Sequence, residues 1–93
     1  MDMRRASFVE KRVFLNHLIG KRVQIYFTRT LAYSGRLMSI DDSLTYLKLS
    51  MVINLVTNGT AAIDTFCTKH IFYVCEDPLE RDQFWIQKEH GQK

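Results

Sequence analysis

The spacing of hydrophobic positions changes from helical to alternating at Gly20. Before Gly20, apolar residues recur every three to four positions, at Val9, Val13, Phe14 and Leu18. Ser7 and Glu10 have the spacing of a capping box, and glycine is favoured just past the end of a helix. The pattern therefore predicts a short amphipathic helix over residues 7–19, with these four residues as its apolar stripe.

After Gly20, apolar and polar residues alternate as they do in half-buried strands. The alternation and the turn residues delimit five strands, over residues 21–28, 31–40, 44–53, 60–68 and 70–75. Gly35 inside the second strand predicts a sharp bend or a close backbone approach, and Asn58-Gly59 is a strong hairpin signal. The elements predict a mainly β fold, in which a short N-terminal helix precedes a strongly bent five-stranded antiparallel small barrel. A C-terminal tail over residues 76–93 follows, and we expect residues 79–88 to form a docking helix.

Length and composition limit the classes of protein that this chain can belong to. The 93 residues predict one domain over residues 1–93, and 46% hydrophobic with 25% charged residues is a globular balance. Cys67 and Cys75 are the only cysteines and lack the spacing of a zinc site or a disulfide framework. The two edges of an open sheet must be covered, and pairing between subunits in a closed ring is one solution. We therefore expect an intracellular, oligomeric module that holds no metal and no cofactor.

Charge and candidate chemistry favour binding over catalysis. Residues 1–30 hold seven of the thirteen Lys and Arg residues but only two acids, so this half can meet phosphate or be a solvated face. Asp41 and Asp42 are adjacent with diverging side chains, and no third group orients a pairing of Cys67 or Cys75 with His70. We therefore expect that the chain is not an enzyme.

Residues 35–45 resemble the first motif of the Sm and Sm-like (LSm) proteins. Three positions match the glycine, hydrophobic residue and aspartate of that motif: Gly35, Leu37 and Asp41. Leu44 and Thr45 replace its usual methionine and asparagine. Residues 66–74 resemble the second motif, although Cys67 and Thr68 replace its Arg-Gly pair. The resemblance covers residues 7–75, and it is greatest to the D1-type Sm proteins and their counterpart in the histone pre-mRNA processing particle.

The family resemblance implies a ring of subunits that binds single-stranded, uridine-rich RNA, one base per subunit. It places Ser43 at the base-stacking position, Thr45 at the base-reading position and Cys67 at the arginine position, with Lys69 as a nearby cation. Gly35, Leu37 and Asp41 are implied to be structural. Serine cannot stack on a base as an aromatic ring does, and cysteine carries no positive charge, so we expect this subunit to bind its base weakly.

Two functions remain open at this point. The first is a subunit of a hetero-oligomeric Sm/LSm ring in a ribonucleoprotein particle of splicing or pre-mRNA processing, in nucleus and cytoplasm. The second is a protein-only Sm-like scaffold of an snRNP assembly complex, which the replaced residues Thr45 and Cys67 favour. Lys69 and His70 also resemble the lysine-histidine pair of the bacterial Hfq proteins, but residues 50–62 are longer than that family normally allows.

Overall fold

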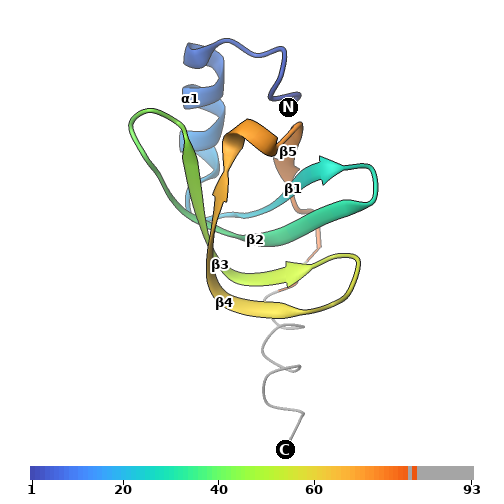
Figure 1. The fold of residues 1–93 in the computed structure, drawn as a ribbon. Helices are drawn as coiled ribbons and strands as arrows, with labels where there is room; N and C mark the ends of the chain where they lie inside the picture. Colours follow the sequence, from blue (N-terminus) through green and yellow to red (C-terminus); the bar gives the residue numbers. More distant parts are fainter. Residues whose placement is uncertain (80, 82–93) are drawn as a thin grey trace, which may run out of the picture.

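The computed structural model describes residues 1–79 and 81. Helix α1 is followed by five strands and one 3-10 turn (Figure 1): α1 (Phe8–Leu18), β1 (Arg22–Thr28), β2 (Leu31–Ile40), β3 (Tyr46–Asn54), β4 (Thr60–Cys67), η1 (Thr68–His70) and β5 (Tyr73–Glu76). The strands form one antiparallel sheet in the order β4-β3-β2-β1-β5. The predicted fold class, an N-terminal helix before a bent five-stranded antiparallel sheet, is confirmed.

Strand β2 bends where the sequence predicts a bend. The register between β2 and β3 shifts between Ser34 and Arg36 and again between Leu37 and Ser39. Gly35 lies in the first shift, opposite Val23 of β1. A Cβ atom at Gly35 would lie 2.9 Å from Leu49 Cδ2 and 3.2 Å from the backbone oxygen of Ser50. The missing side chain therefore lets β3 approach β2 closely at the bend.

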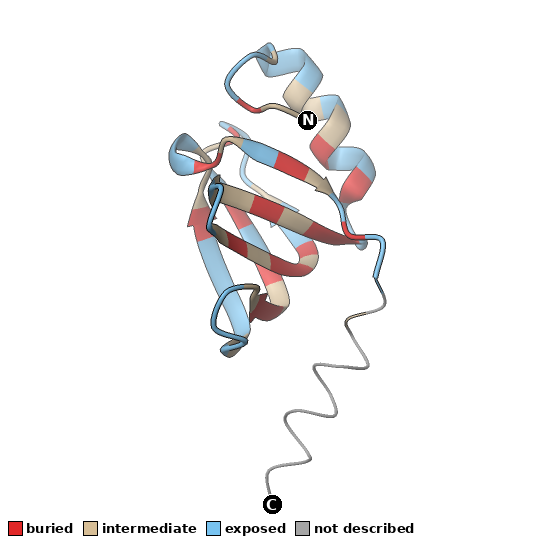
Figure 2. Ribbon diagram, turned by 90° about the vertical axis from the view of Figure 1, so that its right-hand side faces the viewer, coloured by how far each residue is buried: buried red, intermediate tan, exposed pale blue. Residues whose placement is uncertain are grey.

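Buried side chains fill the inside of the curved sheet. Buried positions recur along the strands between less buried ones, as the bands of colour in Figure 2 show. The most fully buried apolar residues are Leu15, Val23, Ile25, Leu37, Leu47, Leu49, Ile53 and Val74. With Phe66 of β4, which belongs to the same cluster, the core contains residues of α1 and of all five strands.

The predicted capping box of α1 is present, but only Leu18 and Phe14 of the predicted apolar stripe contact the core. The Ser7 hydroxyl accepts the Glu10 N–H at 3.1 Å, and the Glu10 carboxylate accepts the Ser7 N–H at 3.0 Å. Only Leu15 and Leu18 of the helix are buried. Val9 and Val13 are 68% and 65% exposed, because the core contacts of α1 come from its C-terminal half.

Several predicted bounds differ from the structure by one to three residues. The third strand begins at Tyr46, not at residue 44, because Leu44 has a left-handed φ of 58° that interrupts extended backbone. Thr68 and His70, which the pattern placed at the end of the fourth strand and the start of the fifth, lie in the turn η1, so the fifth strand begins at Tyr73. The docking helix expected over residues 79–88 lies almost wholly outside the described residues. No helix among the described residues is long and apolar enough to cross a membrane.

A buried polar network ties the segment after β5 to the sheet. The Arg22 guanidinium donates to the Ser34 hydroxyl at 3.1 Å and to the Met51 carbonyl at 2.7 Å. Ser34, which is fully buried, donates to the Asp77 carboxylate, and Arg81 pairs with that carboxylate at 2.6 Å. Each buried charge thus has a hydrogen-bonded partner, as burial requires.

Candidate functional site

The loop between β2 and β3, residues 41–45, is held by Asp41. Its carboxylate accepts the Ser43 hydroxyl and, at 2.7 Å, the Tyr46 N–H. The hydrogen bond from Ser43, followed by that from Tyr46, lowers the pKa of Asp41 below its ordinary value. Leu44 points into the core with 6% of its surface exposed. Asp41 therefore shapes the loop.

The turn η1 is hydrogen-bonded to this loop. The Thr68 N–H donates to the Thr45 carbonyl at 2.8 Å, and the Thr68 hydroxyl donates to the Leu44 carbonyl at 2.6 Å. Tyr46 of β3 pairs with Cys67 of β4 directly beside these bonds. Two segments that lie more than twenty residues apart in the sequence therefore form one unit.

The structure places three of the four predicted RNA-contacting residues, Ser43, Thr45 and Lys69, within this unit and the fourth, Cys67, directly before η1. The hydroxyls of Ser43 and Thr45 lie 2.7 Å apart, and Cys67 follows on the paired strand. Lys69 is exposed on η1. The predicted structural residues Gly35 and Leu37 are buried in β2 and lie in the core, not in these loops. The paired loops offer hydroxyls and a thiol, so their polar groups can hydrogen-bond a ligand but cannot stack on it.

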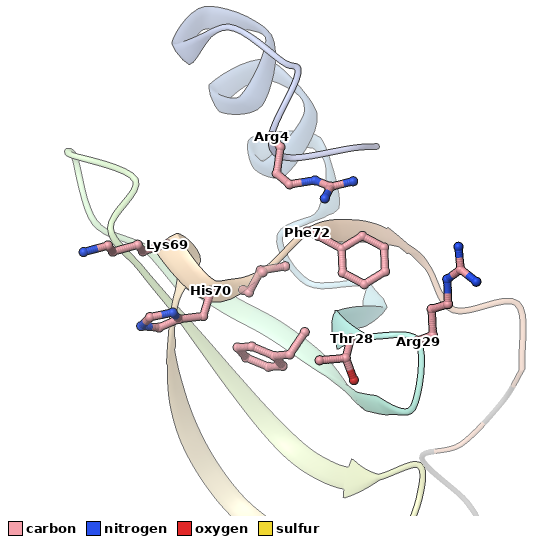
Figure 3. A pocket seen from close by; sticks show the side chains of 8 residues that line it. Arg4, Thr28, Arg29, Lys69, His70 and Phe72 are labelled. Carbon is pink, nitrogen blue, oxygen red and sulfur yellow. The ribbon is translucent and has the colours of Figure 1, made fainter.

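A cationic and aromatic cleft of about 520 Å³ continues from η1 (Figure 3). Four of its lining side chains can carry positive charge: Arg4, Arg29, Lys69 and His70. Figure 3 shows Phe72 between Arg4 and Arg29, with Lys69 and His70 on the side of η1. The Arg4 guanidinium lies 5.3 Å from the centre of the Phe72 ring. An aromatic ring with arginines on two sides, in a cleft that also holds Lys69, matches the chemistry that binds a base and its phosphate.

Sequence reasoning identified Lys69 but missed Arg4, Arg29 and Phe72. These residues come from the N-terminal segment, the β1–β2 turn and the approach to β5, so only the folded chain gathers them. The excess of basic residues in positions 1–30 is the one sequence signal that points to this cleft, because it includes Arg4 and Arg29.

No protein-family model and no curated protein matches the amino-acid sequence. Solved structures do match the fold. The chain is similar to the SmAP1 heptamer of P. aerophilum, with a TM-score of 0.65 and 17% identity over 78% of this chain and 100% of that one. It is also similar to the Sm protein of Pyrococcus abyssii in complex with a uridine heptamer, with a TM-score of 0.62 and 12% identity over 71% and 96% of the two chains.

A third similar structure is a chain of the NatC complex bound to Gag peptide and CoA. Its TM-score is 0.58, with 16% identity over 78% of this chain and 97% of that one. At sequence identities this low, the similarity to these structures shows the fold alone. The chain described here has the Sm-like fold.

Proposed function

We propose that this chain is a non-catalytic, Sm-type subunit of a ring assembly that contacts single-stranded, uridine-rich RNA. The observation that carries the proposal is the hydrogen-bonded unit of residues 41–45 and η1, with the cationic and aromatic cleft beside it. Two similar solved structures support the proposal. The P. aerophilum protein is a heptamer, and the P. abyssii protein is in complex with a uridine heptamer. Other Sm/LSm-type subunits are the proposed partners, joined through strand edges.

The proposed setting is a ribonucleoprotein particle of splicing or pre-mRNA processing, in nucleus and cytoplasm. The support is the resemblance of Asp41-x-Ser43 and of Asp77-Pro78-Leu79 to D1-type Sm proteins and their histone pre-mRNA counterpart. The low reactivity of the Cys75 thiol also agrees with a binding role. Burial raises the pKa of the Cys75 thiol, which keeps it in the less reactive protonated form.

The proposed RNA contact divides between the loops and the cleft. Ser43 and Thr45 hydroxyls can hydrogen-bond a base edge, but Cys67 contributes no charge. Phe72 can supply the stacking surface that the loops lack, which is worth about 1–3 kcal/mol per base. Lys69 and Arg29 can each neutralise a phosphate. The cleft therefore compensates for the weak loop site.

The second candidate is the protein-only scaffold, and two observations favour it. Cys67 stands where the family places a cation, and Val9 and Val13 expose an apolar helix face that protein contact could cover. In addition, a chain of the NatC complex has this fold. The two candidates differ in whether RNA contacts the cleft.

Titration of labelled oligouridine onto the assembled protein at two salt concentrations tests RNA contact. Lys69→Ala should weaken binding and flatten the salt dependence of log K by about 0.7, the value for one phosphate of a single strand. Phe72→Leu should weaken binding by about tenfold or more through lost stacking. Lys48→Ala is the matched control, because Lys48 is an exposed lysine of β3 outside the cleft.

Restoring the family residues gives the opposite test. Thr45→Asn with Cys67→Arg should strengthen binding, because asparagine offers both a donor and an acceptor and arginine adds a planar cation. If neither the losses nor the restoration changes affinity, no base contacts these residues, and the protein-only scaffold is the better account.

A further inference from the structure

The first three residues of the chain lie antiparallel along β5, on the edge that faces away from β1. The Met3 N–H donates to the Phe72 carbonyl at 2.8 Å, and the Val74 N–H donates to the Met1 carbonyl at 3.0 Å. Asp2 lies opposite Tyr73 as an antiparallel bridge partner. Figure 1 shows the N-terminus beside β5. Residues 1–3 therefore act as a short sixth strand, which we call the N-terminal strand.

Side-chain burial anchors the N-terminal strand. Met3 is 6% exposed and belongs to the hydrophobic core, and Met1 packs against the same cluster. Asp2, between them, turns outward and pairs with Arg4 and Arg5. This alternation is that of a strand with one face on the core. The segment is therefore seated by packing as well as by backbone hydrogen bonds.

The two edges of the sheet consequently differ. The sheet ends at β4 on one side and at β5 on the other. Within the described part of the chain, no segment pairs with the outer edge of β4, and Ile63 of that strand is 53% exposed. The outer edge of β5 is occupied by the N-terminal strand. A ring of identical contacts joins two different edges, so it needs β4 of one subunit on β5 of the next.

We propose that the N-terminal strand competes with the β4 strand of a neighbouring subunit for the edge of β5, so that ring assembly requires its release. This inference rests on the ring assembly put forward under Proposed function. The physical reason is that the Val74 N–H cannot pair with Met1 and with an incoming strand at once. The eight residues of β4 can pair along the whole of β5, Tyr73–Glu76, whereas the three N-terminal residues pair only with residues 72–74. The N-terminal strand thus covers the β5 edge of a free subunit and prevents non-specific pairing there. It is displaced when β4 of a neighbouring subunit binds to that edge.

A reversible disulfide across the N-terminal strand tests this competition. The variant carries Asp2→Cys and Tyr73→Cys, with Cys67→Ser and Cys75→Ser to remove the natural thiols. Asp2 and Tyr73 are directly opposite, with the flanking residues making the hydrogen bonds, and such pairs have Cα atoms close enough for a disulfide. Light scattering after size-exclusion chromatography then compares the oxidised and the reduced protein. The same chain, reduced, is the matched control.

The reduced protein should assemble into rings as concentration rises, whereas the oxidised protein should stay monomeric or stop at dimers joined through β4. The oxidised protein should need a concentration at least about tenfold higher than the reduced protein for half of it to assemble. Equal assembly in both states would overturn the competition and leave the ring intact as a proposal. A second variant lacking residues 2–5 should assemble at lower concentration than the natural chain. If the natural chain, the reduced protein and the truncated protein all stay monomeric, a ring built from copies of this chain alone is wrong. The competition is then refuted if the oxidised and the reduced protein join purified partner subunits equally well.

Discussion

Replacing Gly35 by alanine measures how closely β3 approaches the bend of β2. The new Cβ atom would lie 2.9 Å from Leu49 Cδ2, 3.0 Å from Leu49 Cβ and 3.2 Å from the Ser50 carbonyl oxygen. Leu49 is fully buried, so it cannot turn away into solvent, and Ser50 contributes backbone. Two strands must therefore move apart by a few tenths of an ångström.

The expected cost follows from two opposing effects. Overpacking of a buried site costs about 1–3 kcal/mol. Alanine also lowers the conformational entropy of the unfolded chain relative to glycine, which stabilises the folded protein by about 0.4–1 kcal/mol. The φ of Gly35 is not positive, so alanine adds no backbone strain. The net loss in the free energy of unfolding should be about 1–2 kcal/mol, which lowers Tm by about 4–16 °C for a domain of this size.

Thermal and urea unfolding, followed by far-UV circular dichroism, measure this loss. Gly59→Ala is the matched control: its Cβ would contact only the Thr57 hydroxyl, at 3.3 Å, and its site is exposed. The control should change stability by less than about 0.5 kcal/mol. Gly35→Val should destabilise more than Gly35→Ala. If Gly35→Ala and Gly59→Ala unfold together with the natural chain, the close approach at the bend is wrong.

Two further predictions concern the polar groups that fix the ends of the fold. Asp77→Asn should lower the free energy of unfolding by about 1–3 kcal/mol at pH 7, because Ser34 and Arg81 lose a charged acceptor. Burial raises the pKa of Asp77, but its hydrogen bonds outweigh that effect and leave the pKa below its ordinary value of 3.8. The natural chain should therefore lose this stability as pH falls below about 4. Urea unfolding measured at several pH values should show that pH dependence for the natural chain and not for the variant. Identical dependence of stability on pH in the two proteins would contradict the network. Ser7→Ala should remove about 1 kcal/mol of capping and speed amide exchange at Glu10, and unchanged exchange would contradict the cap.

The sequence was informative wherever a residue acts on its own neighbours. Ser7 and Glu10 predict the start of α1, and Gly20, with φ of 88°, lies just past its end. Alternation predicts the sheet, because a side chain on a strand with one buried face must alternate. Gly35 predicts the bend for the same local reason.

The rest depends on contacts between distant segments. The predicted apolar stripe placed Val9, Val13, Phe14 and Leu18 against the core. The packing of α1 on the sheet covers Leu18 and the unpredicted Leu15 instead of Val9 and Val13. Met1 and Met3 flank a single polar residue, a pattern too short to predict a strand until β5 lies beside it. The cleft around Phe72 likewise forms only in the folded chain, and the excess of basic residues in positions 1–30 is the one sequence signal that points to it.

Native mass spectrometry of the complex purified from the source organism tests the central claim, a subunit of an Sm-type ring, most directly. The account predicts this chain in one assembly with further Sm-type chains and with bound RNA. A ring without RNA would favour the protein-only scaffold. Recovery of the chain as a monomer, or in a complex that holds no second Sm-type chain, would contradict the account.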